Sequence, residues 1–199
     1  LAGPVGCGIS TVLRMIAGVE DITDGVLLVD GERMNETPSI DRDMAMIFKN
    51  GKLYPQMNIY DNLAFGLKLK ELPIGEIDAR IAEVTQVLNI GHLLDKMTED
   101  LDEKERALVV LGRAIVKKPK VFLLDEPFSS LSKELKKEMQ ELLWSLYEKM
   151  QITVVYVTHN TEDIRHTDTR VAVMNDGSVQ QIGTIGELYD KPATPYVSE

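Results

Sequence analysis

A glycine-rich segment near the start of the chain has the spacing of a phosphate-binding loop. The stretch "GPVGCGIST", residues 3–11, follows the pattern G-x-x-x-x-G-K-[ST] except that Ile9 stands where the pattern has lysine. In such loops backbone N–H groups cradle phosphates and the lysine reaches them with a positive charge. The segment is therefore either a nucleotide site without its usual charge or a glycine-rich turn.

Two carboxylates and a histidine follow apolar segments later in the chain. Asp125 and Glu126 end "KVFLLDEP", and His159 ends "ITVVYVTH". Ligands of open α/β sheets bind beyond the carboxyl ends of the strands, which makes these three residues candidates for one site. A carboxylate there can hold Mg²⁺ through water, and its neighbour can orient or deprotonate an attacking water. The alternatives are that the Asp-Glu-Pro sequence starts a surface turn and that the histidine is structural.

The elements that would position these residues alternate between strands and helices. A helix is predicted after the loop, ending at Gly18, followed by a hairpin around Asp30-Gly31 and a strand in "MAMIFKN". Strands over 120–127 and 152–159 flank an amphipathic helix over 134–150, and a last hairpin turns at Asp176-Gly177. Strand, helix and strand in this order predict an α/β fold with a parallel sheet flanked by helices.

Residues 54–118 are predicted to form an inserted helical subdomain, because their pattern is helical throughout. The clearest segment is "GEIDARIAEVTQVLNI", in which one stripe carries five apolar residues at helical spacing. These residues are Ile77, Ile81, Val84, Val87 and Leu88.

Composition narrows the class of protein. A chain of 199 residues, 44% hydrophobic and 27% charged, can build one core or a core with a smaller attached subdomain. The single Cys7 cannot form an intramolecular disulfide, and no apolar run approaches the roughly eighteen residues of a membrane span. A net charge of −10 without a basic stripe argues against a nucleic-acid partner. Because the first motif begins two residues after Leu1, we expect the sequence to be a fragment of a longer chain.

Five segments, in order and at matching spacing, resemble the ATP-binding subunit of an ABC transporter, closest to importers of maltose, other sugars and glycerol phosphate. The segments are "GPVGCGIST", "FKNGKLYPQMNIYDNLAFGLKL", "LGRAIVKKPKVFLLDEPFSSL", "VYVTH" and "VMNDGSVQQIGTIGELYDKPA". The resemblance covers essentially the whole chain. It implies a P-loop NTPase-type nucleotide-binding domain over residues 1–199, incomplete at its N-terminus.

The resemblance also implies partners and a location. A second nucleotide-binding domain would pair head to tail with this one, with two Mg-ATP between them, and the dimer would drive a transmembrane permease from the cytoplasmic face. Within the helical subdomain, "YPQMNIYDNLAFGLKL" would contribute to the groove that receives the permease. Exposure of Met57 or Phe65 would favour docking there, whereas burial would favour a core role.

Site roles follow from the resemblance residue by residue. Ser10 and Asp125 would bind Mg²⁺, Glu126 would be the base, and His159 would be the switch histidine. Lys49 stands where the family has the glutamine of its Q-loop. The nucleotide would be bound by the loop residues Gly3, Gly6, Cys7, Gly8, Ile9, Ser10 and Thr11, together with Lys49.

Departures from the family pattern occur at four of its nucleotide-contacting motifs. Besides Ile9 and Lys49, "LDEKE" (residues 101–105) replaces the signature LSGGQ, and Ser132 replaces the aspartate of the D-loop. Asp102 and Glu105 have the spacing of a capping box, so a phosphate arriving at this helix start would meet carboxylates, offset in part by the neighbouring lysine.

These departures keep three interpretations open. The chain is an energy-coupling ATPase subunit with impaired activity, a pseudo-ATPase scaffold that keeps the fold and permease contact, or a non-functional relic or artificial variant. Nothing in it matches the aromatic residue that stacks on adenine in the family. A further hypothesis is that Lys49 replaces the missing cation of the loop.

Overall fold

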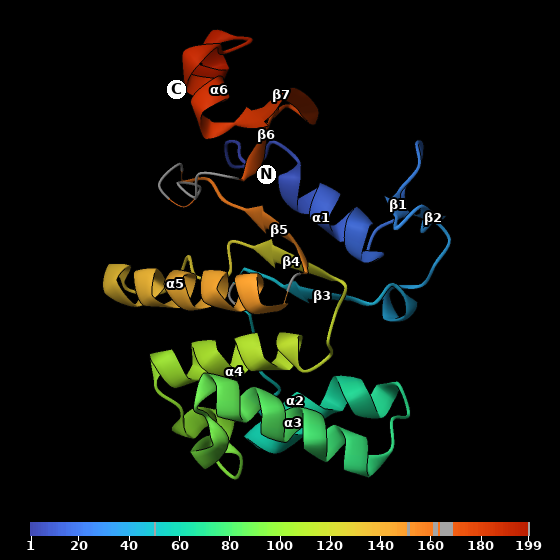
Figure 1. Ribbon diagram of the computed structural model, residues 1–199, viewed down its shortest axis with the longest axis vertical. Helices are drawn as coiled ribbons and strands as arrows, with labels where there is room; N and C mark the ends of the chain where they lie inside the picture. Colours follow the sequence, from blue (N-terminus) through green and yellow to red (C-terminus); the bar gives the residue numbers. More distant parts are fainter. Residues whose placement is uncertain (50, 151, 161–162, 164–168, 199) are drawn as a thin grey trace. The chain divides into compact units, whose positions relative to one another are not determined.

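The computed structural model of the protein describes residues 1–49, 51–150, 152–160, 163 and 169–198 (Figure 1). The chain divides into two compact units. The loop unit comprises Leu1–Arg42, Leu123–Glu126 and Val155–Glu199, and the helical unit comprises Asp43–Phe122 and Pro127–Val154. None of the helices in the described ranges is long and apolar enough to cross a membrane.

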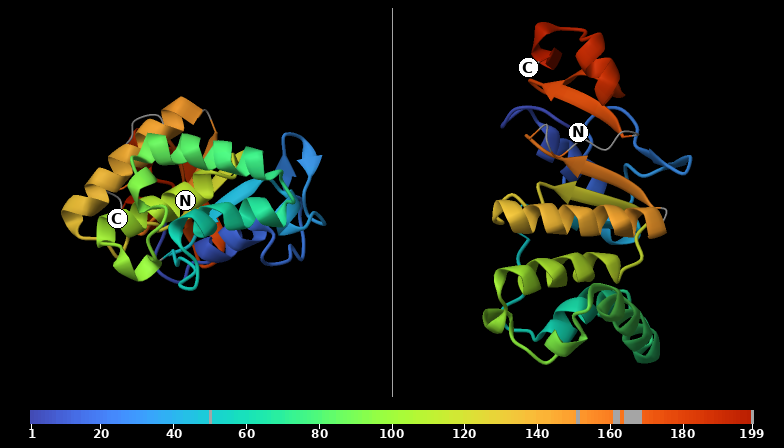
Figure 2. Two further views of the ribbon diagram at one scale, coloured as in Figure 1. Left: turned by 90° about the horizontal axis from the view of Figure 1, so that it is seen from below. Right: turned by 60° about the vertical axis from the view of Figure 1, so that its left-hand side comes forward.

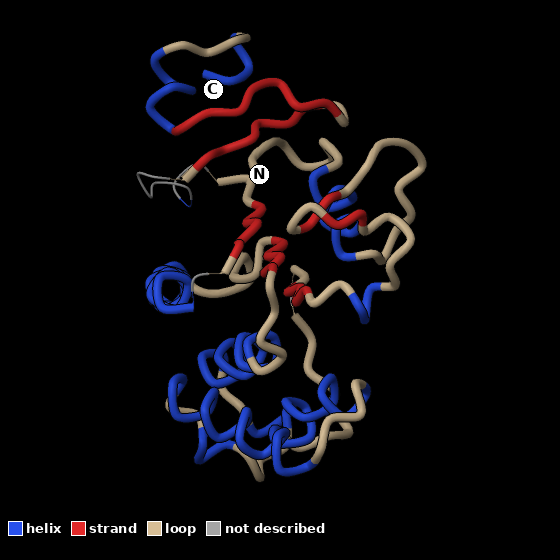
Figure 3. Tube along the Cα trace, turned by 45° about the vertical axis from the view of Figure 1, so that its right-hand side comes forward, coloured by secondary structure: helices blue, strands red, loops and turns tan. Residues whose placement is uncertain are grey.

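The two strands that precede the predicted site residues belong to one parallel sheet. It consists of β3 (Met44–Ile47), β4 (Val121–Asp125) and β5 (Thr153–Val157) in the order β3-β4-β5 (Figure 3). Every residue of β4 is buried, as expected of a strand that is covered on both faces. In β5 only the last two residues, Tyr156 and Val157, are buried, and Thr153 is exposed.

The loop unit contains both predicted hairpins. β1 (Leu28–Val29) pairs antiparallel with β2 (Glu32–Arg33), and β6 (Arg170–Asn175) pairs antiparallel with β7 (Ser178–Thr184). Its other elements are α1 (Ile9–Ala17), η1 (Ser39–Asp41), α6 (Ile185–Asp190) and η5 (Pro195–Ser198). Ala2 forms parallel bridges with Thr158 and Val173, so the start of the phosphate loop lies between the end of β5 and β6.

Helix α1 is held at its C-terminal end. It ends as predicted at Gly18, whose N–H donates to the carbonyls of Arg14 and Met15 in a left-handed C-cap. The buried side chain of Arg42 donates to the carbonyls of Met15 and Ile16 at 2.8 and 2.9 Å. A guanidinium at a helix C-terminus binds free carbonyls and complements the helix dipole, so Arg42 fixes the helix that follows the loop. No motif in the sequence pointed to this residue.

The helical unit contains α2 (Ile59–Leu69), α3 (Ile74–Leu88), η2 (Gly91–Leu93), η3 (Thr98–Asp100), α4 (Glu103–Ile115) and α5 (Lys133–Met150) (Figure 2). Helices α2, α3 and α4 pack on one another. The predicted stripe of α3 is buried at Ile77, Ile81, Val84 and Leu88. The prediction was wrong for Val87, which is 52% exposed because it lies at the edge of that stripe.

Candidate functional site

The glycine-rich loop adopts the backbone conformation that its glycines permit. Gly8, the residue before α1, has φ 95° and ψ 0°, in the left-handed region. Position 3 requires a glycine because the backbone of Met174 lies close to it: a Cβ there would be 2.3 Å from the carbonyl oxygen of Met174. At the other side of the loop, the carbonyl of Cys7 accepts a hydrogen bond of 3.0 Å from the amide of Gly177. The loop is therefore fixed by main-chain contacts with the β6–β7 hairpin.

The N-terminus of α1 is open to an anion. No side chain caps it, since its N-cap is Gly8, and no acidic residue lies in its first turn. The first N–H groups of a helix have no partner within the helix, and the helix dipole adds partial positive charge there. This end of α1 therefore retains the physical basis of a phosphate site even without a lysine.

Ile9 belongs to the core rather than to the surface of the loop. Its side chain is buried, with 2% of the residue exposed. The Cδ1 atom of Ile9 would lie 3.1 Å from a Cβ built on Gly3, so the side chain fills the space beneath the start of the loop. An isoleucine at the lysine position thus packs the loop from below and leaves no charged group there.

Two side chains with oxygen atoms that could bind a metal meet between the start of α1 and the end of β4. The Ser10 hydroxyl donates a hydrogen bond of 3.0 Å to the Asp125 carboxylate, which is 7% exposed. Mg²⁺ prefers oxygen ligands and keeps several waters, so a hydroxyl and a carboxylate suit this metal. Among the described residues, no group of three or more His, Cys, Asp and Glu side chains forms a metal cluster. Ser10 and Asp125 therefore fit a water-rich Mg²⁺ site.

Glu126 and His159 are brought together as well. The Nε2 atom of His159 lies 2.9 Å from Oε1 of Glu126, and its Nδ1 contacts the carbonyl oxygen of Gly3. Since a neutral imidazole donates from one nitrogen only, the imidazolium form satisfies both oxygen acceptors. Glu126 has φ 44°, a left-handed conformation that is uncommon for a residue with a side chain and is often found at functional sites. The histidine thus links the Asp-Glu pair to the first residue of the loop.

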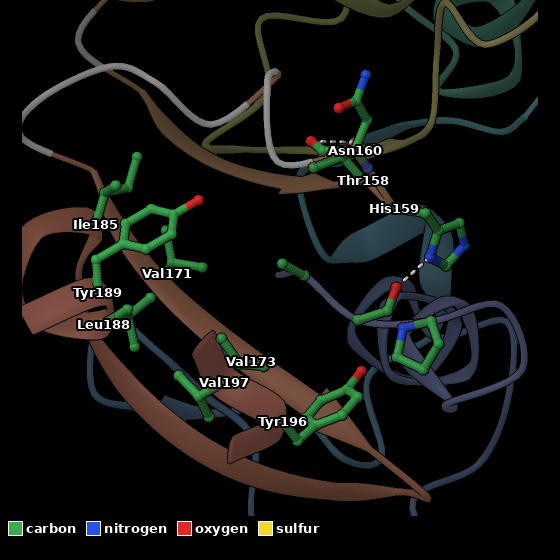
Figure 4. A pocket seen from close by; sticks show the side chains of 13 residues that line it. Thr158, His159, Asn160, Val171, Val173, Ile185, Leu188, Tyr189, Tyr196 and Val197 are labelled. Carbon is green, nitrogen blue, oxygen red and sulfur yellow. Dashed lines mark hydrogen bonds between the residues drawn. The ribbon is translucent and has the colours of Figure 1, made fainter. Parts of the chain in front are cut away.

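A pocket of about 240 Å³ lies beside this histidine. Figure 4 shows His159 on one side of the pocket and Tyr189 on the opposite side. Its remaining lining is mainly apolar and includes Val171, Val173, Ile185, Leu188, Tyr196 and Val197. This mainly apolar lining does not suit a triphosphate, although Gly3 and Pro4 of the glycine-rich loop also line the pocket.

The helix start that replaces the family's signature is closed by its own side chains. The Asp102 carboxylate accepts a hydrogen bond of 2.7 Å from the amide of Glu105, and the Glu105 carboxylate accepts one of 3.0 Å from the amide of Asp102. The predicted capping box is confirmed. The hydrogen bond from the Asp102 amide, and then the one from Lys96, lower the pKa of Glu105 below 4.5. A carboxylate therefore occupies the N-terminal end of α4.

Lys104, next to the capping box, does not give the start of α4 a free positive charge. The Nζ atom of Lys104 lies 2.5 Å from a carboxylate oxygen of Glu138 on α5, and Lys96 pairs with Glu105 at 3.0 Å. Both lysines are thus engaged by acids of the helical unit. Lys49 is exposed and also belongs to the helical unit, so its proposed replacement of the loop cation stays a hypothesis.

Docking residues predicted in the helical unit divide between core and surface. Leu67 is 1% exposed and belongs to the core. Met57, Tyr60 and Phe65 are half-buried, and the Phe65 ring packs against Tyr54 at a centroid distance of 4.8 Å. The exposed parts of these side chains remain candidates for a partner surface.

Comparison with known proteins gives the family. Residues 1–129 match the family model described as ABC transporter. The uncharacterized ABC transporter ATP-binding protein YurJ of Bacillus subtilis is 44% identical over 198 residues, which is 100% of this chain and 54% of YurJ. The oligosaccharides import ATP-binding protein MsmX of the same species is 44% identical over 195 residues, which is 98% of this chain and 53% of MsmX.

A solved structure supports the same assignment. It is cbiO1 from Clostridium perfringens, described as part of the ABC transporter complex cbiONQ, with a TM-score of 0.82 and 25% identity. The similarity covers 96% of this chain and 79% of that one. The chain spans about half the length of the curated relatives it matches. With the loop, the Asp-Glu pair and the histidine in one unit, the chain belongs to the ABC transporter family as an ATP-binding subunit.

Proposed function

We propose that this protein is the ATP-binding subunit of an importer for sugar-type solutes, with impaired nucleotide turnover. Its solute class follows from the likeness to MsmX, an oligosaccharide import protein. Partners would be a second nucleotide-binding domain and a transmembrane permease, as membership of cbiO1 in a transporter complex suggests. The protein would then act at the cytoplasmic face of the membrane.

Retained groups support binding of Mg-ATP. The open N-terminus of α1 would bind phosphate, and Ser10 with Asp125 would hold Mg²⁺. Bound Mg²⁺ would neutralise charge on the phosphates. Glu126 would orient or deprotonate the attacking water, and His159 would hold Glu126 in place through their 2.9 Å contact. The helical subdomain over residues 54–118 would carry the permease contact.

Impaired turnover is supported most strongly by the capping box at the start of α4. The helix satisfies its own amides with Asp102 and Glu105, and Lys104 is paired with Glu138. A phosphate held by the opposite subunit would approach these carboxylates at a repulsion of about 1 kcal/mol in water and about 4 kcal/mol at an effective dielectric near 20, for charges 4 Å apart. Closure of an ATP-loaded dimer would be opposed.

A second function is a scaffold that keeps the permease contact without nucleotide turnover. The buried Ile9 favours it, because the loop lacks a charge-assisted contact worth about 1.5–3 kcal/mol and the isoleucine has become part of the core. In this case the remaining contacts of the loop would not hold Mg-ATP.

The proposed impairment of turnover is tested by comparing the rate of Mg-ATP hydrolysis by the chain with the rate of a variant that restores the family's motifs. The restored variant carries Ile9→Lys, Lys49→Gln, Asp102→Ser, Glu103→Gly, Lys104→Gly, Glu105→Gln and Ser132→Asp. We expect the restored variant to hydrolyse Mg-ATP much faster than the chain does, and adding Glu126→Gln to the restored variant should remove that rate. A comparable rate in the unrestored chain would overturn the proposed impairment.

Titration with labelled ATP and Mg²⁺ then separates the two functions. Weak but saturable binding, lost in Asp125→Ala, supports the impaired ATPase. No binding supports the scaffold. The solute class is tested by oligosaccharide uptake in cells that lack an importer's ATP-binding subunit and receive the restored variant.

A further inference from the structure

Arg42 is the only buried arginine or lysine among the residues that the structure describes. Its guanidinium donates only to main-chain carbonyls. Nη1 donates to Met15 and Ile16 at 2.8 and 2.9 Å, Nε to Thr37 at 2.8 Å, and Nη2 to Asn35 at 3.3 Å. In the same part of the chain no carboxylate pairs with it. Because an arginine in a protein stays protonated, a positive charge lies here without a counter-charge, although buried charges are usually paired.

This charge lies at the C-terminal end of α1, opposite the open N–H groups of the first turn. A Cβ built on Gly18, the C-cap of α1, would lie 2.6 Å from Nε of Arg42, so the guanidinium lies directly against the helix end. A helix of nine residues rises about 14 Å, which sets the approximate distance from this charge to an anion at the first turn.

The guanidinium reverses the sign of the helix end that it caps. A helix C-terminus carries about half a negative charge, which opposes an anion at the N-terminus, and the unit positive charge of Arg42 outweighs it. At an effective dielectric of about 20 to 80, a unit charge about 14 Å away strengthens binding of one negative charge about two- to eightfold. Salt screens a buried charge less than an exposed one. The loop itself contains no cation, so this charge behind the helix gains importance.

We propose that Arg42 is a positioning residue of the nucleotide site, which fixes α1 by its last carbonyls and raises the phosphate affinity of the opposite helix end through its charge. This inference rests on the proposed binding of Mg-ATP at α1. Arg42 touches no phosphate and acts through the helix between them. Its contribution to Mg-ATP affinity is about three- to tenfold.

Arg42→Gln and Arg42→Lys separate the charge from the hydrogen bonds. Both remove the planar fork that donates to several carbonyls, and only the lysine keeps the charge. We expect Arg42→Gln to weaken Mg-ATP binding about three- to tenfold and Arg42→Lys to weaken it less than about twofold. Titration calorimetry at about pH 6.5 measures both, so that a lysine with a moderately lowered pKa stays charged. Both variants should have a lower urea midpoint.

The charge of the ligand gives a second readout. Mg-ADP carries about one negative charge fewer than Mg-ATP, so Arg42→Gln should weaken its binding by a smaller factor. Loss of helix anchoring alone would weaken both ligands equally. The control is Arg33→Gln on β2, which removes the same charge from an exposed side chain paired with Glu36 at 2.9 Å, and it should leave both affinities unchanged.

Gly18→Ala tests the geometry while it keeps every charge, because the new Cβ would displace the guanidinium. Gly25→Ala is the matched control. Gly25 has φ 89° and Gly18 has φ 73°, so alanine is strained at both positions, but no atom lies within 4 Å of a Cβ on Gly25. Only Gly18→Ala should weaken Mg-ATP binding, by about twofold. This pair tests the proposal even if Arg42→Gln does not fold.

Every variant is also made in the Ile9→Lys background, in which the loop carries its own cation. Equal losses from Arg42→Gln and Arg42→Lys, equal losses for Mg-ATP and Mg-ADP, unchanged affinity in Arg42→Gln, or equal effects of the two glycine substitutions would each overturn the proposal. In these cases Mg-ATP still binds, so the proposed function stands. If neither background binds Mg-ATP, the proposed nucleotide binding fails and this inference fails with it.

Discussion

Two helix N-termini in this chain differ in whether they are open to an anion. α1 begins after Gly8, which has no side chain to cap it, and its first turn contains no acid. α4 begins after Asp102, forms a reciprocal capping box with Glu105, and also carries Glu103 in its first turn. Both helices start with the same unsatisfied N–H groups and the same dipole. Side chains alone therefore decide that one end is ready for phosphate and the other is closed to it.

The capping box that closes the N-terminus of α4 increases the local stability of the helix. A capping box satisfies two amides that would otherwise need water or a ligand, and acids in the first turn complement the helix dipole. A signature built from glycine and serine would leave these amides for a nucleotide and would make a weaker helix start. The capping box at α4 therefore favours stability, whereas functional sites commonly give up stability for activity.

Ile9→Lys should produce the largest change at the open end. A lysine there adds a charge-assisted contact, so we expect Mg-ATP affinity to rise about ten- to a hundredfold, measured by titration calorimetry. The free energy of unfolding should fall by about 2 kcal/mol in urea, because the buried isoleucine is lost and the lysine stem replaces it only in part.

The matched control for this change is Ile9→Met, which alters packing without adding charge. It should leave the affinity for Mg-ATP unchanged. If Ile9→Lys did not raise the affinity for Mg-ATP, the loop would not be a nucleotide site, and the open N-terminus of α1 would not bind phosphate.

Gly8→Ala should destabilise the open end by about 1–2 kcal/mol, because an L-residue is strained at φ 95°. A clash is not the cause, since the nearest atom to the new Cβ is the Cα of Gly177 at 3.6 Å. The control is Gly75→Ala in α3, where no atom lies within 4 Å and alanine should stabilise the helix by up to about 1 kcal/mol. Urea unfolding measures both, and equal effects of the two substitutions would contradict the assigned strain.

Asp102→Ala should cost about 1 kcal/mol of stability at the closed end, the usual effect of removing an N-cap. The measurement is again the free energy of unfolding in urea. Thr184→Ala is the matched control, because Thr184 forms the same capping box with Glu187 at the start of α6. If Asp102→Ala left stability unchanged while Thr184→Ala lowered it, the cap on α4 would be refuted.

Local patterns in the sequence predict much of this comparison. The capping box follows from the D-x-x-E spacing, and the open loop follows from its glycines, since both depend on contacts within a few residues. The burial of Ile9 and the clamp of Arg42 on α1 could not be predicted, because they depend on which distant residues pack against them. The same holds for the contact between His159 and Gly3, which joins residues far apart in the sequence.

Acidification should weaken the closed end through protonation of Glu105. The folded-state pKa of Glu105 lies below its ordinary 4.5, first because of the hydrogen bond from the Asp102 amide and next because of Lys96. A carboxylate with a lowered pKa stabilises the fold at pH values above 4.5, and that contribution disappears as the pH falls through the folded-state pKa.

The measurement is the urea midpoint of the chain and of Glu105→Gln between pH 7 and pH 3. Above pH 5 the chain should be the more stable of the two, and the difference should vanish at the acid end. A difference between chain and variant that stays constant with pH would show that Glu105 stabilises α4 by packing rather than by charge, and would remove the electrostatic part of the contrast between the two helix ends.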